Sequence, residues 1–293
     1  MTKGYVMRTI SRHDIDVEFS RVRCGEYTED LDESLVEENV DSRDLHGIQR
    51  DSLMIAKFRT VDDPTVAESE TQRYVELASA ASLAKFVAVE PLSDGYGVDL
   101  GGRKITVQES TPDIHHDVDN WLTALWLAVV CRNEERIQRL ATVSVDNVLR
   151  VAGPEYDDFM YSWVDALQRY FRNEDVQQSF VSAIEGTAPE RIRISSESIV
   201  LRLLYPPIEM MYRVLDRDEA GFNASLASAL DLHRAYWSTR DNADDPDGFI
   251  ALAPLGVAVL AKQAGLRIDV RSEYIPEHLL LGDWISVGEP GSE

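Results

Sequence analysis

The apolar pattern is most regular between Ile199 and Trp237, where it predicts two helices that fold back on each other at Asp216–Glu219. Apolar residues recur at helical spacing on both arms. They are Leu204, Ile208, Met211 and Leu215 on the first arm, and Phe222, Leu226, Leu230 and Trp237 on the second. Pro206 and Pro207 lie inside the first arm, where proline removes backbone hydrogen bonds and clashes with the preceding turn. We therefore expect this arm to kink or to restart at Pro206.

A short pattern typical of helix ends recurs three times after Asp117. In each copy an arginine ends one helix, an Asn or Asp caps the next, and acids fill the first turn of that helix. The copies are Arg132-Asn133-Glu134-Glu135, Arg172-Asn173-Glu174-Asp175 and Arg217-Asp218-Glu219. Their spacings of 40 and 45 residues are typical of tandem helix–turn–helix units.

The predicted fold is therefore mainly α, with stacked helical hairpins in an α-solenoid or repeat-like bundle. The predicted pairs are 117–131 with 134–141, 157–171 with 174–185, and 196–215 with 219–237. The helix over 121–132 is apolar on nearly all sides, so we expect it to be central. The aromatic residues of 157–171 share one face, which favours packing between helices over a ligand cage.

Other elements flank this core. Residues 45–59 have helical spacing, and Pro64 is expected to open a second helix. Gly101-Gly102 predicts one short β-hairpin near 98–107, because glycine supplies the positive φ angles of a two-residue turn. Asp245 and Pro246 predict a helix start, and Pro254 a kink in the apolar helix that follows. Residues 266–270 alternate like a short strand, and 276–281 predict a helical turn.

The chain divides into three parts by composition. Residues 1–44 are expected to be a variable, acidic and partly disordered segment with no clear element up to residue 25. Glu26–Asp44 is rich in acids, which favours a poorly ordered, solvated stretch or a loosely held helix start. Residues 45–285 then form a single all-helical domain with the repeat-like core at 117–265, and 286–293 form a frayed tail.

Charge narrows the possible partners. The 293 residues include 52 Asp plus Glu against 29 Lys plus Arg, a net charge of −23. Such a field repels phosphate backbones, so we expect no nucleic-acid partner. It would attract basic proteins, but from charge alone a role in solubility is the favoured explanation. Cys24 and Cys131 form no disulfide or zinc pattern, and a reducing cytoplasm is the expected location. No apolar run reaches the ~20 residues that span a bilayer, so no membrane association is expected.

Short motifs for catalysis are weak. Ser82 and Lys85 form Ser-x-x-Lys, but the companion motifs of serine hydrolases are missing, so chance occurrence is favoured. His116-Asp117 resembles half of a metal-phosphohydrolase pair without evident further ligands. We expect His115 and His116 to be solvated residues ahead of a helix. The sequence thus predicts no catalytic residue, no metal and no cofactor.

Two further residues deserve a structural test. Asp165 lies inside a predicted helix and is the acid for which a perturbed pKa is most worth testing, with a structural hydrogen bond as the favoured explanation. Cys131 ends a core helix and is expected to be a small buried hydrophobe.

Seven ordered motifs carry a family resemblance. They are WLTALWLAVVCR (121–132), Tyr156-Asp157 with WVDALQ (163–168), LRLLYPPIEMMYRVLDRD (201–218), GFNASL (221–226), LHRAYW (232–237), DDPDGFIALAPLG (244–256) and SEYIPEHLL (272–280). Together they resemble the immunity protein 49 family of bacterial polymorphic toxin systems, from about Asn120 to Trp284. The resemblance implies a mostly helical protein that binds a cognate toxin domain and protects the producing cell, with no catalytic residues.

One surface is the expected toxin contact, because it combines aromatic side chains with acids that suit a cationic partner. Its residues are Tyr205, Glu209, Trp237, Asp241, Asp244 and Asp245. Capping and packing are the favoured alternative roles for these side chains. Two other functions stay open: a helical-repeat adaptor for another protein, and a hydrolase that uses His116 and nearby acids.

Overall fold

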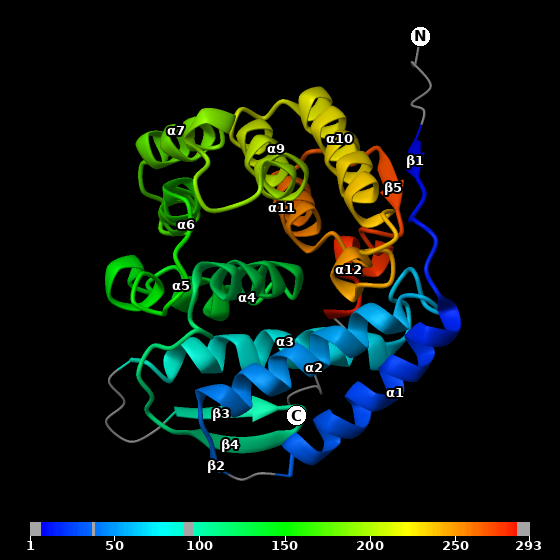
Figure 1. Ribbon diagram of the computed structural model, residues 1–293, viewed down its shortest axis with the longest axis vertical. Coiled ribbons are helices and arrows are strands. Elements are labelled where there is room, and N and C mark those ends of the chain that lie inside the picture. Colours follow the sequence, from blue (N-terminus) through cyan, green and yellow to red (C-terminus); the bar gives the residue numbers. More distant parts are fainter. Residues whose placement is uncertain (1–6, 37–38, 91–95, 286–293) are drawn as a thin grey trace, which may run out of the picture.

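The computed structural model describes residues 7–36, 39–90 and 96–285. Within these ranges the chain is mainly helical, which confirms the predicted class. A layer of three helices and a small sheet, formed by the first part of the chain, lies against the helical hairpins of the second part (Figure 1). The predicted frayed tail, 286–293, lies outside the described residues.

Three helices form the N-terminal layer. They are α1 (Val17–Ser34), α2 (Ser42–Arg59) and α3 (Ser69–Val87). The central α2 packs against both neighbours and confirms the helix predicted over 45–59. It begins at a capping box, in which the Asp41 carboxylate accepts the Asp44 N–H at 3.1 Å and the Asp44 carboxylate accepts the Asp41 N–H at 2.8 Å.

Helix α1 was not foreseen. The sequence indicated no element up to residue 25 and a poorly ordered stretch or helix start over Glu26–Asp44, whereas α1 runs continuously to Ser34. Asp16 caps it by accepting the Phe19 N–H at 2.9 Å. Only Ser20 and Leu31 are buried in this helix, so the apolar periodicity that reveals most helices is nearly absent.

Pro64 does not open a helix, contrary to the prediction. The carboxylate of Asp63 accepts the backbone N–H groups of Ala67 and Glu68, each at 2.9 Å. These bonds hold residues 63–68 in a turn, and α3 begins only at Ser69.

A three-stranded sheet lies beside α3. Its strands, in the order β2-β4-β3, are β2 (Asn39–Val40), β4 (Arg103–Val107) and β3 (Tyr96–Leu100). β3 and β4 are the predicted hairpin, and Gly101 and Gly102 have φ angles of 66° and 92°. The parallel pairing of β2 with β4 joins distant positions and was not predicted.

The second part of the chain forms the predicted helical hairpins, which lie side by side in Figure 1. The hairpin helices are α4 (Val118–Val130), α5 (Glu134–Leu140), α6 (Asp158–Phe171), α7 (Gln177–Gly186), α9 (Tyr205–Leu215) and α10 (Glu219–Trp237). Short elements between them are η1 (Val145–Leu149), η2 (Pro189–Arg191), α8 (Glu197–Ile199) and η3 (Val200–Leu204). η3 is a π-helical turn, and α9 restarts directly after it with Pro206 and Pro207 in its first turn, as expected.

The recurring helix-end pattern corresponds to one backbone geometry. Arg132, Asn173 and Arg217 have φ angles of 51°, 57° and 53°. In each turn the next residue's N–H donates to the carbonyl five positions back, as in a Schellman motif. Asn133 and Asp218 cap the following helices as predicted, whereas Asn173 is the left-handed residue itself and does not cap α7.

The apolar helix α11 (Leu252–Gln263) packs against both α4 and α9, so it joins the first hairpin to the third. A Cβ on Gly256 would lie 2.5 Å from the Trp126 ring, so these two helices touch closely. Asp245 does cap a helix, but only the short 3-10 turn η4 (Pro246–Gly248). Pro254 lies in the first turn of α11, where proline requires no kink.

The two ends of the described chain meet in a second sheet. β1 (Arg8–Ile10) pairs in parallel with β5 (Val270–Ser272), and α12 (Glu277–Leu281) follows. Figure 1 shows both strands at one edge of the molecule, next to α10. The predicted strand near 266–270 therefore exists, shifted toward 272, and its partner lies more than 250 residues away.

Candidate functional site

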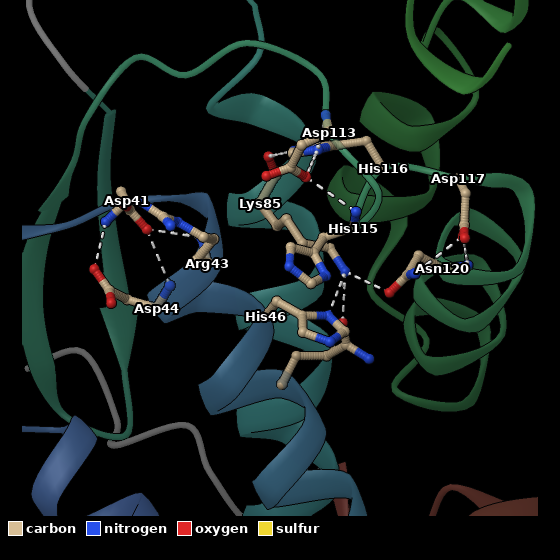
Figure 2. Close-up of polar contacts among 11 residues, drawn as sticks. Asp41, Arg43, Asp44, His46, Lys85, Asp113, His115, His116, Asp117 and Asn120 are labelled. Atoms are coloured by element: carbon tan, nitrogen blue, oxygen red, sulfur yellow. Dashed lines mark hydrogen bonds and ion pairs between the residues drawn. The ribbon is translucent and has the colours of Figure 1, made fainter. Parts of the chain in front are cut away.

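A buried lysine lies where α2, α3 and α4 meet (Figure 2). The Lys85 side chain on α3 is 0 % exposed. Its Nζ donates to Gln49 Oε1 and to Asn120 Oδ1, both at 2.7 Å, and lies 3.4 Å from His46 Nδ1. These acceptors come from α2 and from the first turn of α4, so one ammonium group joins three helices.

The Lys85 cluster contains no carboxylate bonded to the ammonium among the described residues. Burial therefore lowers the pKa of Lys85 to about 7, against the opposing charges of Asp117 and Asp113. Burial, and then the charge of Lys85, lowers the pKa of His46 to about 4. Both side chains thus have strongly lowered pKa values, and such shifts are common at functional sites.

The Lys85 cluster nevertheless lacks access for a reactant. Ser82 Oγ donates to the Ala78 carbonyl at 2.7 Å, and Lys85 Nζ is bonded to α2 and α4 instead. The Ser-x-x-Lys sequence is therefore not a nucleophile–base pair here. With Lys85 fully enclosed, the arrangement joins helices and presents no reactive amine to solvent.

His116 is buried, and the expectation that it is solvated was wrong. Its Nδ1 lies 2.8 Å from Asp113 Oδ1 and its Nε2 lies 3.1 Å from the Lys85 carbonyl, so both ring nitrogens are used. His115 is half-buried and stacks on His46 with ring centroids 4.0 Å apart. Through the Lys85 carbonyl, His116 fastens the loop before α4 to the backbone of α3.

Asp117 has a role separate from that of its neighbour His116. It caps α4 by accepting the Asn120 N–H at 2.9 Å, and it accepts the Tyr156 hydroxyl at 2.9 Å. The two residues once considered as half of a metal pair therefore serve different contacts. Across the described residues no group of three or more His, Cys, Asp or Glu side chains is placed to hold a metal ion.

A cavity of about 350 Å³ lies next to the Lys85 cluster and shares His46 and Gln49 with it. Its walls come from α2, η3, α9, α10 and the start of α11, so it lies between the N-terminal layer and the hairpins. Much of the lining is apolar, including Leu53, Met54, Leu203, Pro206, Ile250 and Pro254. This size falls at the lower end of small-ligand pockets.

The charged lining of this cavity is cationic. It comprises Arg50, Lys57 and Arg202 against the single carboxylate of Asp247, a net charge of +2 in a protein of −23. Lys57 Nζ lies 2.5 Å from Asp247 Oδ1, and the charge of Lys57 lowers the pKa of Asp247 although burial opposes it. Sequence reasoning placed none of these four residues at a cavity, because a charged residue in a helix or helical turn carries no signal that it faces one.

The residues predicted to contact a toxin are distributed along two adjoining stretches. Trp237 lines the cavity and packs against Gly248, where an added Cβ would lie 2.7 Å from the indole ring. Tyr205 and Glu209 are half-buried on α9, and Glu209 accepts the Ser225 hydroxyl at 3.1 Å. Neither of these two α9 residues belongs to the cavity wall that Trp237 lines.

The three predicted acids lie in the loop after α10. Asp241, Asp244 and Asp245 are all exposed. Asp244 accepts the Asp16 N–H at 3.1 Å, and Asp245 caps η4 by accepting the Asp247 N–H at 2.9 Å. Two of the three thus have structural contacts, while Asp241 is the one that only faces solvent in the described chain.

Asp165 has the structural hydrogen bonds that were favoured for it. Burial alone would raise the pKa of Asp165, but the hydroxyl of Ser179 and the guanidinium of Arg169, 2.8 Å away, lower it overall. Cys131 is buried at 4 % exposure, as expected, and burial raises the pKa of its thiol.

Comparison with known proteins gives one positive result. No helix within the described ranges has the length and apolar character to cross a membrane. No curated protein and no solved structure matches the chain. A family model described as Immunity protein 49 matches residues 63–279, more than half of the sequence, and begins well before the stretch on which the resemblance was first seen. The chain therefore belongs to the immunity protein 49 family.

Proposed function

We propose that this protein binds a cognate toxin domain of a bacterial polymorphic toxin system and neutralises it in a stoichiometric complex. The observation that carries this proposal is the match of residues 63–279 to an immunity protein family. The protein acts in the cytoplasm of the producing cell, where it covers or distorts the active site of the toxin before damage occurs. It needs no cofactor and performs no catalysis.

Charge supports a basic toxin as the partner. The net charge of −23 accelerates encounter with a cationic domain and disfavours binding to nucleic acid. Many surface arginines of the described chain already pair with an acid. The acids in excess of them therefore remain available to a basic partner. The proposed contact surface comprises Tyr205, Glu209, Trp237, Asp241, Asp244 and Asp245, three of which are exposed acids of one loop.

The test is co-expression with the adjacent upstream reading frame in a sensitive host, scored first by growth and then by co-purification. Rescue of growth together with a stable complex supports stoichiometric neutralisation. Rescue without a complex contradicts it and favours enzymatic detoxification. If the neighbouring product is harmless by itself, it is not a toxin, and a role as a helical adaptor for another protein is favoured.

A further inference from the structure

The lining of the cavity beside Trp237 differs in charge from the chain as a whole. It carries three cationic side chains and one carboxylate, whereas the whole chain has 23 more acids than bases. Arg50 is paired with Asp51 at 2.7 Å and Lys57 with Asp247 at 2.5 Å. Arg202 has no hydrogen-bonding or ionic partner among the described residues, so its charge is available to a ligand.

The backbone around Arg202 is also unusual. Arg202 lies in η3, a π-helical turn inserted between α8 and α9. Such insertions leave backbone hydrogen bonds less regular than in an α-helix and occur frequently at functional sites. Here η3 places Arg202 and Leu203 side by side in the cavity wall, one charged and one apolar.

The ring of Trp237 lines the same cavity. Its indole Nε1 is buried and has no acceptor among the described residues, but surrounding atoms cover it, so this N–H does not face the cavity. Arg202 therefore presents an unused donor to a cavity whose other walls are largely apolar, with the Trp237 ring beside it.

We propose that this cavity binds a carboxylate on an apolar body, presented by the toxin as an acidic side chain, with Arg202 as the anchoring donor. A guanidinium favours a carboxylate through paired, charge-assisted hydrogen bonds, and the apolar walls take up the stem that carries it. Asp245 accepts the N–H of Asp247, which lines the cavity, so the loop with the exposed acids at 241–245 borders it. The interface therefore combines an acidic rim with a cationic centre, which fixes the register of the partner. This proposal rests on the proposed function.

The chemistry of the cavity is tested first on the purified protein with a matched pair of probes. Phenylacetate carries a carboxylate one methylene group away from a phenyl ring, and phenylacetamide has nearly the same shape without charge. The indole N–H resonance of Trp237, assigned with Trp237→Phe, is followed by NMR during each titration. We expect a saturable shift with phenylacetate that weakens at least about tenfold in Arg202→Gln, and a far weaker response to the amide. Equal binding of the two probes, or no shift of this resonance, overturns the proposal.

The occupant is tested in the complex with the product of the adjacent reading frame. Arg202→Gln is expected to weaken this complex at least about tenfold, as for other arginine anchors of interfaces, and phenylacetate should compete with the toxin. The matched control is Arg217→Gln, an exposed arginine at the other end of α9. If the wild-type complex forms and Arg202→Gln binds equally well, the anchoring role is wrong while the proposed function stands. If the wild-type protein forms no complex, the proposed function fails and the toxin-borne carboxylate with it.

Discussion

Arg132 and Arg217 have the same left-handed backbone conformation, with φ angles of 51° and 53°, but only Arg132 is tied down by its side chain. The guanidinium of Arg132 donates to the carbonyls of Val130, Leu279 and Leu280 at 2.6–3.1 Å. Arg217 is exposed and makes no such contact in the described chain. These two arginines thus share one turn geometry, with a compensating side-chain contact at Arg132 and none at Arg217.

This difference predicts opposite effects for the same substitution. Arg217→Gly should stabilise the protein by about 0.5–1 kcal/mol, because glycine adopts the left-handed region without steric cost. Arg132→Gly should destabilise it by about 1–2 kcal/mol, because three hydrogen bonds from a charged group disappear. Urea denaturation measures both, and a stabilised Arg132→Gly would contradict the role given to its side chain.

Lys85 predicts an unusual dependence of stability on pH. Its folded pKa of about 7 lies below the ordinary 10.5, so between these values the unfolded chain binds more protons than the folded one. The cost of the buried charge is fully present below about pH 7 and disappears as the pH rises toward 10.5. Relative to Lys85→Met, the wild-type free energy of unfolding should rise by up to about 1.4 kcal/mol per pH unit in this window.

Denaturant titrations at several pH values between 7 and 10.5 measure this slope in both proteins. Parallel curves for wild type and Lys85→Met would mean that Lys85 stays charged in the folded state. Gln49→Leu removes one acceptor of the ammonium and serves as a second variant, with stability expected to fall most at the lower pH.

The hydrogen bonds of Asp157 predict that acid weakens the link between the start of α6 and the backbone at 193–195. Its carboxylate accepts the N–H groups of Arg193, Ile194 and Ser195 at 2.6, 3.0 and 2.8 Å. Burial would raise the pKa of Asp157, but these three bonds lower it overall. The stabilisation is therefore complete above the ordinary pKa of 3.8 and is lost as the pH falls through the lower folded value.

Replacement of this carboxylate should cost about 2–3 kcal/mol of stability in Asp157→Asn and speed amide exchange at 193–195. Asp158→Asn is the matched control, since Asp158 is the exposed neighbour in the first turn of α6. Hydrogen exchange at neutral pH separates the two variants. Equal protection of the 193–195 amides in both would remove the proposed role of Asp157.

The contact between α11 and α4 predicts a large effect from one methyl group. Gly256→Ala places a Cβ 2.5 Å from Trp126, so it should destabilise the protein by about 1–3 kcal/mol. Gly47→Ala is the control, because a Cβ there meets nothing within 4 Å and alanine favours the helix by about 0.5–1 kcal/mol. Thermal unfolding should therefore move in opposite directions in the two variants.

The acidic loop predicts a kinetic effect on toxin binding. Asp241→Lys should lower the association rate with a basic toxin several-fold at low salt and leave stability unchanged, because Asp241 is exposed and holds no structural contact in the described chain. Asp216→Lys, at the opposite end of the α9–α10 hairpin, is the control. Stopped-flow measurements at two salt concentrations test this, and equal rates in both variants would place the contact elsewhere.

The sequence was sufficient where contacts are local. Helical periodicity and capping predicted all three hairpin pairs, and Gly101-Gly102 predicted the β-turn. It was insufficient for α1, which buries only two residues and therefore shows little apolar periodicity. It also failed at Pro64, where the Asp63 carboxylate accepts the Ala67 and Glu68 N–H groups and the helix begins only at Ser69. Pro64 fits a helix start by its residue type, and this side-chain turn is a competing local structure that the pattern did not reveal.

The site was harder to predict than the fold. Trp237 was selected from the sequence and does line the cavity, but Lys57, Arg202 and Asp247 meet it only through folding. The burial of His116 depends on a carbonyl on α3, and that of Lys85 on acceptors from two other helices. No single-sequence pattern encodes such long-range partners.

The pairing of β1 with β5 bears on how this protein is dissected. The family match at 63–279 contains β5 but excludes β1, and also excludes His13, whose ring lies 2.7 Å from the Tyr274 hydroxyl. A fragment cut to the matched boundaries would leave the edge of β5 unpaired and Tyr274 without its partner. Exposed strand edges promote association between chains. Expression of the bare fragment would thus yield self-associating material, and a toxin tested against it would meet an aggregate in place of the native inhibitor.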